Sequence, residues 1–180
     1  MRLTRALFAG SAGDSVEVPV MQDRISPFPA IAIPGAIAGL VGAVLIDAYL
    51  LLTLVVAGHV ATVAGFYAYV ASGALGKAAY ATPGAVALGI AVHFAVAIAW
   101  GIGYAYVAAR TPQVLARPFL SGTVFGILVM VAMQFVEVAA NIYVLPNTVL
   151  FFNGVIAHVV FFGIPVASIV GRRLGARAAR

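Results

Sequence analysis

The chain has 180 residues, of which 64% are hydrophobic and only 8% are charged, and its mean hydropathy is +1.12. A soluble domain of this size would have too few polar side chains to cover its surface, so the composition excludes a water-soluble globular protein. The formal net charge of +5 comes from basic residues at the ends of apolar segments, which indicates membrane topology rather than nucleic-acid binding. Cysteine is absent, which excludes disulfides, iron–sulfur clusters and thiolate metal sites.

Residues 1–28 differ in composition from the rest of the chain and are predicted to form a cytoplasmic N-terminal tail. The apolar run at 6–10 is shorter than the core of a signal peptide, so we expect the tail to stay attached. The prolines at its end favour extended backbone before the first helix. Three of the five acidic residues of the chain lie in this tail: Asp14, Glu17 and Asp23.

Four apolar segments are long enough to cross a membrane, because about 20 apolar residues in a helix span a hydrocarbon core of about 30 Å. The segments are 31–57, 83–109, 119–144 and 149–171. They predict an all-α, integral membrane four-helix bundle over residues 29–173, followed by a basic cytoplasmic C-terminal tail at 174–180.

The connection between the first two segments is the longest, and it contains Phe66, Tyr67 and Tyr69. Aromatic residues favour the membrane–water boundary, so we expect a short interfacial helix over about 62–74, with a tilted extension of the first span as the alternative. The connection at 145–148 is a tight turn, which makes the third and fourth helices antiparallel neighbours.

The distribution of basic residues predicts the orientation of the chain. The two tails and the connection between the second and third segments hold nine of the ten Lys and Arg residues, whereas the other side holds Lys77 alone. The positive-inside rule then places both termini of a multi-pass protein in the cytoplasm.

The four segments repeat one pattern, in which a helix with a carboxylate precedes a helix with a histidine. Each carboxylate follows a Gly-x-x-x-Gly pair, and each histidine lies four residues after a glycine. We interpret this order as a duplicated two-helix unit in which the glycines allow close helix packing. In chain order the residues are Gly35, Gly39 and Asp47, then Gly89 and His93, then Gly122, Gly126 and Glu137, and finally Gly154 and His158.

The ionisable residues of this repeat lie nine or ten residues from the outer ends of their predicted helices. At about 1.5 Å per residue this is about 15 Å, close to the membrane midplane, where charge is costly and indicates a function. Gln134 lies on nearly the same helix face as Glu137. We therefore predict a polar midplane layer of Asp47, His93, Gln134, Glu137 and His158.

Three interpretations of this layer are open. The carboxylates can join helices through partners across the bundle, with no further chemistry. His93 and His158 can hold a haem b as axial ligands, because they lie on helices of the same direction at matching depth. Asp47, Glu137 and the two histidines can also bind a metal ion such as Zn, Fe or Mn, or relay protons.

Short motifs are spread along the apolar part of the chain: Ala71-Ser72-Gly73-Ala74-Leu75-Gly76, Leu88-Gly89, His93-Phe94, Tyr104, Arg110, Ile156-Ala157-His158 and Gly163-Ile164-Pro165. They resemble a group of small bacterial inner-membrane proteins with four helices and no assigned activity. The resemblance covers about residues 31–173. It implies the four-helix architecture in the bacterial inner membrane, and it marks Asp47, His93 and His158 as positions of interest. It implies no substrate or cofactor, and Glu137 lies outside its pattern.

The sequence contains no phosphate-binding loop, nucleophile elbow, zinc-protease motif or dinucleotide fingerprint. We therefore expect a non-enzymatic membrane protein that serves as an accessory or interaction subunit of a larger assembly, with lipid and a membrane protein as partners and no cofactor. The alternative is a protein that uses the polar layer to handle a small ligand, a proton or a metal ion, or a bis-histidine haem b protein.

Overall fold

The structure is a computed structural model that describes residues 28–178, with side chains through residue 176. The predicted tail at 1–27 lies outside the described residues. Every regular element in the described range is helical, which confirms the all-α prediction. In chain order the elements are α1 (Phe28–Leu50), η1 (Leu51–Val56), α2 (Val63–Leu75), η2 (Gly76–Tyr80), α3 (Ala85–Arg110), α4 (Pro112–Ala116), α5 (Pro118–Ala139), α6 (Thr148–Ile156), η3 (Ala157–Gly163) and α7 (Ile164–Ala178).

Four helices in the described part of the chain are long and apolar enough to cross a membrane, as the sequence predicts. The first consists of α1 and η1, the second of α3, the third of α5, and the fourth of α6, η3 and α7. The fourth helix continues to Ala178, so residues 174–178, which the sequence analysis assigns to the C-terminal tail, are helical. The four candidate spans are Phe28–Val56, Ala85–Arg110, Pro118–Ala139 and Thr148–Ala176.

The third span ends at Ala139, whereas the sequence analysis predicts its end at residue 144. Asn141 has a left-handed backbone conformation, with φ of 57°. The N–H of Asn141 donates to the Val138 carbonyl at 3.1 Å, and the N–H of Ile142 donates to the Glu137 carbonyl at 3.0 Å. These two bonds form a Schellman motif, which terminates the helix. Apolar residues continue beyond this point, which is why hydropathy alone extends the helix too far.

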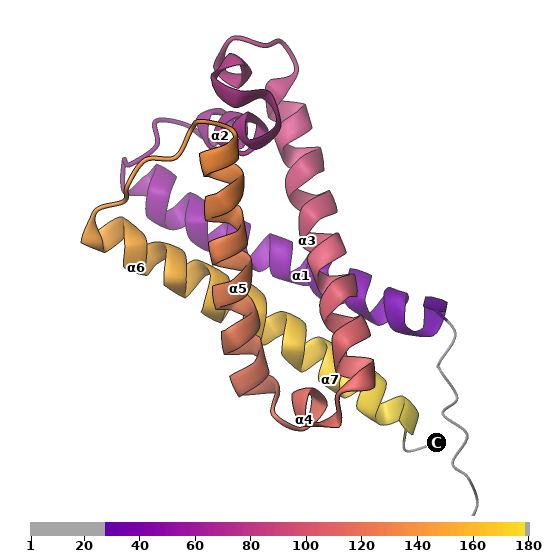
Figure 1. Cartoon of the computed structure of the whole chain (residues 1–180). Coiled ribbons are helices and arrows are strands. Elements are labelled where there is room, and N and C mark those ends of the chain that lie inside the picture. Colours follow the sequence, from indigo (N-terminus) through magenta and orange to yellow (C-terminus); the bar gives the residue numbers. More distant parts are fainter. Residues whose placement is uncertain (1–27, 179–180) are drawn as a thin grey trace, which may run out of the picture.

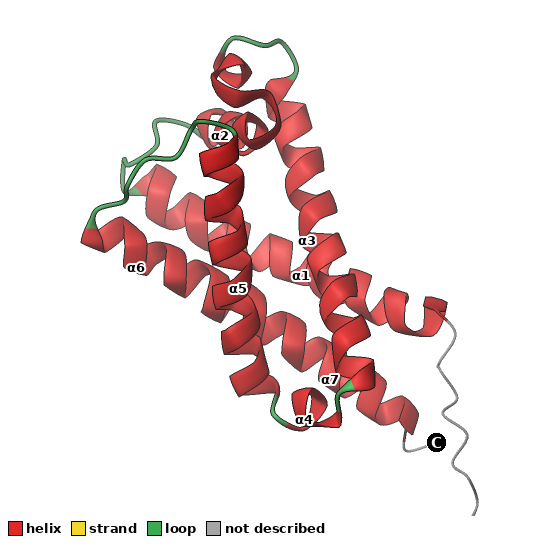
Figure 2. Ribbon diagram, in the orientation of Figure 1, coloured by secondary structure: helices red, strands yellow, loops and turns green. Residues whose placement is uncertain are grey.

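The four long helices form two crossed layers. α1 and the α6–η3–α7 helix run as antiparallel neighbours, and α3 and α5 cross them (Figures 1 and 2). α1 packs against α3, η3 and α7, whereas α5 packs against η3 and α7. The third and fourth spans are therefore neighbours, as predicted. α4 lies toward the end of the bundle where α1 begins and α7 ends, and α2 lies at the opposite end (Figure 1).

The core lies where these helices cross, around the ring of Phe125. The rings of Trp100, Tyr104 and Phe162 surround it, with centroid distances of 6.1, 4.8 and 5.9 Å. The Tyr104 hydroxyl lies 2.8 Å from Ser121 Oγ, and this hydrogen bond links α3 to α5. Aromatic rings thus fill the centre of the bundle, while small residues line the helix contacts around it.

Glycine pairs bring the helices into backbone contact. Gly35 and Gly39 of α1 face α3, and Gly122 and Gly126 of α5 face η3 and α7. A Cβ atom on any of the four would lie between 2.6 and 2.8 Å from a Cα atom of the opposite helix. Because no side chain fits at that distance, only glycine allows this packing.

The same contacts define which residues of the two halves correspond. Gly39 faces Ala97, and Gly126 faces His158. His158 therefore corresponds to Ala97, one helical turn after His93, and not to His93 as the sequence repeat suggests. The reason is that the helices pack by their Gly-x-x-x-Gly pairs and not by the glycine before each histidine. The duplication itself stays a prediction.

α2 is the short helix that the sequence predicts at about 62–74. Thr62 caps its N-terminus, where Oγ1 accepts a hydrogen bond from the Gly65 N–H at 3.0 Å. The helix packs on α3, and the backbone carbonyl of Tyr67 lies directly against Gly89, which leaves no room for a side chain at that position. Its location at a membrane boundary stays a prediction.

Two of the long helices contain π-helical segments, η1 and η3, that the sequence analysis does not predict. Pro165 follows η3 closely and has no N–H to donate to the carbonyl of Phe161, which gives a physical reason for the wider turn before it. His158 lies in η3, so the local backbone of one predicted site residue departs from a regular α-helix.

Candidate functional site

Three polar side chains from three helices meet in the bundle. Asp47 on α1 is only 5% exposed. The hydroxyl of Tyr67 on α2 donates to Asp47 Oδ2 at 2.8 Å, and His93 Nε2 on α3 lies 2.9 Å from Asp47 Oδ1. The Tyr67 contact is a hydrogen bond, whereas Asp47 Oδ1 and His93 Nε2 form none, and their contact is an ion pair when His93 is protonated.

Helix packing explains why these three groups meet. The close approach of α1 and α3 at Gly35 and Gly39 places the next turns of both helices side by side, which brings Asp47 to His93. The contact of Gly89 with the Tyr67 backbone then fixes α2 over the same turn of α3.

This group contains one acid and one base. Asp47 and His93 together carry no net charge when they share one proton, and a neutral group is the form least penalised by burial. Burial, and then the hydrogen bond to Asp47, raise the pKa of Tyr67 to about 12. The Tyr67 hydroxyl therefore keeps its proton and acts as the donor.

An inner cavity of about 230 Å³ lies beside this group. Apolar side chains from all the long helices and from α2 form most of its wall, and the polar side chains on it are the imidazoles of His93 and His158. Trp100, the one tryptophan of the chain, also borders the cavity. An apolar cavity with a few polar groups is the usual form of a small-molecule site.

The hydrogen bonding of His158 fixes which ring nitrogen carries the proton. His158 Nδ1 lies 2.9 Å from the Gly154 carbonyl oxygen, which can only accept. Nδ1 is therefore the donor, and in the neutral ring Nε2 is an acceptor. Within residues 28–176 the ring makes no other hydrogen bond, so the acceptor is left for another molecule.

A second polar group lies near the end of α5. The hydroxyl of Tyr69 on α2 donates to Glu137 Oε1 at 2.6 Å. Burial, and then this hydrogen bond, raise the pKa of Tyr69, so its hydroxyl also remains protonated. Glu137 and Gln134 border an open outer cleft of about 1290 Å³ between α5, the 140–147 connection, α6, η1 and α2. His158 borders the outer cleft as well as the inner cavity.

The predicted single layer is thus divided into two groups. Asp47 and His93 are paired, and His158 borders the same inner cavity as His93. Glu137, in the last turn of α5, pairs instead with Tyr69 of α2. α5 ends at Ala139, two residues after Glu137, so this carboxylate lies near the helix end rather than at mid-helix. The predicted packing glycines Gly35, Gly39, Gly89, Gly122 and Gly126 all lie in close helix contacts, whereas Gly154 does not.

The described residues give little support to a metal or haem site. In the described range no three His, Asp or Glu side chains come close enough to hold a metal ion. His93 and His158 do border one cavity, as bis-histidine ligation requires, but Nε2 of His93 is engaged by Asp47. The cavity of about 230 Å³ is also at the small end for a cofactor.

Sequence reasoning missed the two tyrosines that hold the carboxylates. It assigns Tyr67 and Tyr69 to a boundary belt because their segment is short and aromatic. The signal that could have found them is that a packed tyrosine needs a hydrogen-bond partner, and the nearest acceptors in an apolar chain are its few acids.

Comparisons with protein-family models, with curated proteins and with solved structures give no match to this chain.

Proposed function

We propose that the chain is a multi-pass membrane protein whose inner cavity binds a small, largely apolar molecule that carries a hydroxyl group. The observation that supports this is the shared position of His93 and His158 on an otherwise apolar cavity. The proposal corresponds to the small-ligand alternative of the sequence analysis, and it involves no enzymatic step.

The chemistry of the wall supports a ligand of this kind. The apolar side chains favour an apolar body, which a molecule dissolved in lipid has. His158 Nε2 accepts no hydrogen bond within the described residues, so a hydrogen-bond donor on that body would find a partner there. Asp47 holds His93 in place from the far side, in the way that a second polar residue orients a binding imidazole.

Trp100 offers a direct test, because it is the sole tryptophan and borders the cavity. The purified protein in mild detergent is titrated with 4-propylphenol while tryptophan emission is recorded with excitation near 295 nm. We expect a saturable change. The methyl ether 4-propylanisole has the same apolar body but no donor, and it should bind about three to ten times more weakly, the worth of one hydrogen bond.

A pair of variants separates the site from general partition into detergent. His158→Phe keeps a ring of similar size and removes the acceptor, so it should weaken 4-propylphenol binding about three to ten times. His59→Phe is the matched control, since His59 borders the outer cleft but not the inner cavity. Equal binding of the phenol by all three proteins, or no saturable change at all, would refute the proposal.

The location of the protein is part of the same proposal. The apolar helices support insertion into a membrane, and the resemblance supports the bacterial inner membrane. Arg110 and Arg117 flank α4, and Arg172 and Arg173 lie on α7, at the end of the bundle where the positive-inside rule puts the cytoplasm. An accessory subunit of a larger assembly stays a prediction, because the exposed apolar helix faces suit lipid as well as a protein partner.

A further inference from the structure

We infer that the outer cleft is a second binding site, separate from the inner cavity, and that it takes an amphiphilic organic cation such as a quaternary ammonium or phosphonium compound. Its wall joins one carboxylate to a set of aromatic side chains within a volume of about 1290 Å³. The inner cavity has no carboxylate on its wall, and its polar side chains are two imidazoles.

Glu137 is the acidic side chain on the wall of the outer cleft. Within residues 28–176, one acidic side chain lies within 4 Å of a basic side chain, and that pair is Asp47 and His93. Glu137 therefore has no cationic partner among these residues. His59 borders the same cleft but forms no ion pair with Glu137. A partly buried carboxylate without a counter-ion is costly, and a bound cation would remove that cost.

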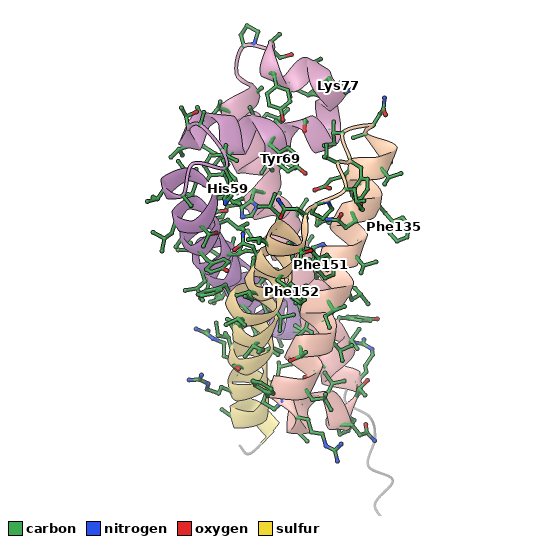
Figure 3. All side chains as sticks on the ribbon, turned by 90° about the vertical axis from the view of Figure 1, so that its left-hand side faces the viewer. His59, Tyr69, Lys77, Phe135, Phe151 and Phe152 are labelled. Carbon is green, nitrogen blue, oxygen red and sulfur yellow. The ribbon has the colours of Figure 1, made fainter. Side chains whose placement is uncertain are left out.

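Aromatic side chains share the wall of the outer cleft with this carboxylate. Phe151 and Phe152 on α6 and Phe135 on α5 border the cleft, on the face that Figure 3 presents together with Tyr69 and His59. All three phenylalanines are exposed, at 47%, 58% and 70%. Aromatic faces attract quaternary cations, which bind by cation–π contacts without needing hydrogen bonds. A cation with apolar substituents therefore fits this wall better than a metal ion or a hydrophilic amine.

The Glu137 carboxylate is already oriented by a hydrogen bond from Tyr69. The Tyr69 hydroxyl holds Glu137 Oε1 at 2.6 Å, and the 140–147 connection that follows α5 forms part of the cleft wall. An acid fixed in this way loses little freedom when a cation binds, which favours affinity. In the inner group, by contrast, Asp47 lies 2.9 Å from His93, whose imidazole compensates the carboxylate when it is protonated.

Two ions of the same shape and opposite charge test the inference on the intact protein. Tetraphenylphosphonium and tetraphenylborate are each measured by equilibrium dialysis against the purified protein in one neutral detergent. We expect saturable binding of the phosphonium, and binding of the borate at least about ten times weaker. Comparable binding of the two ions would overturn the inference without any mutation.

Glu137→Gln then removes the charge and keeps the shape of the side chain. It should weaken phosphonium binding about tenfold or more, as loss of one partner of a poorly solvated ion pair does. Glu137→Asp is the matched control, because it keeps the negative charge, and it should bind the phosphonium more tightly than Glu137→Gln does. Unchanged phosphonium binding in Glu137→Gln would refute the site. Because 4-propylphenol binding is measured at Trp100 on the same proteins, failure of the outer site is distinguishable from failure of the inner one.

Discussion

Replacing Gly101 by alanine tests the packing that positions the whole inner group. Gly101 of α3 lies against the backbone of α1, and a Cβ there would lie 2.7 Å from the Gly39 nitrogen and 2.8 Å from the Gly39 Cα. Gly103 lies two residues further along the same helix, and a Cβ there would meet nothing within 4 Å. The two alanine variants therefore differ in packing alone.

The magnitude follows from these distances. Ordinary contact begins at 3.4 Å, and the Gly35 carbonyl oxygen lies closer still to such a Cβ, so α1 and α3 must separate by more than about 0.7 Å or bend to admit the methyl group. Overpacking of this kind costs about 1–3 kcal/mol. Both variants gain up to about 1 kcal/mol from the higher helix propensity of alanine. The propensity gain cancels in the comparison, so Gly101→Ala should be about 1–3 kcal/mol less stable than Gly103→Ala.

Stability is measured by reversible unfolding in mixed micelles with increasing SDS, followed by far-UV circular dichroism. A displaced α1 should also separate Asp47 from His93 and weaken 4-propylphenol binding in Gly101→Ala but not in Gly103→Ala. Equal stability of the two variants would refute the close backbone contact of α1 and α3, and with it the explanation given for the Asp47–His93 pair.

Two further predictions concern a proton and a turn. Because folding raises the Tyr67 pKa to about 12 from the ordinary value of 10, Tyr67 contributes stability that is complete below pH 10 and is lost as pH rises through 12. The unfolding free energy of wild type should therefore fall over this window relative to that of Tyr67→Phe. Parallel curves of unfolding free energy against pH for the two proteins would contradict the buried hydrogen bond to Asp47. Asn141→Gly should keep or slightly raise stability, because glycine adopts the observed φ of 57° without cost. Asn141→Val should lower stability by about 1–2 kcal/mol, because a branched side chain is strained at this φ. Similar melting curves for both variants would argue against the Schellman motif at the end of α5.

The sequence by itself determined the class of the protein and the number of its long helices. Composition and segment length fix the all-α class and the helix count, because about 20 apolar residues form a helix long enough to cross a membrane. The Gly-x-x-x-Gly pairs predicted which faces pack, since the absence of a side chain is itself the geometric requirement. The acids and histidines were found for the same reason, as rare polar residues in an apolar chain.

Only the tertiary structure decided which of those polar residues meet. The end of α5 depends on a backbone turn at Asn141 that hydropathy does not register, and Glu137 near this end pairs with Tyr69 rather than with His93. The two tyrosines enter through α2, whose place on α3 follows from a single close contact at Gly89. The π-helical turn that carries His158 likewise adds a residue to the helix without changing its apolar pattern. Distances of a few ångströms between helices decide these pairings, and the periodicity of one helix carries no information about them.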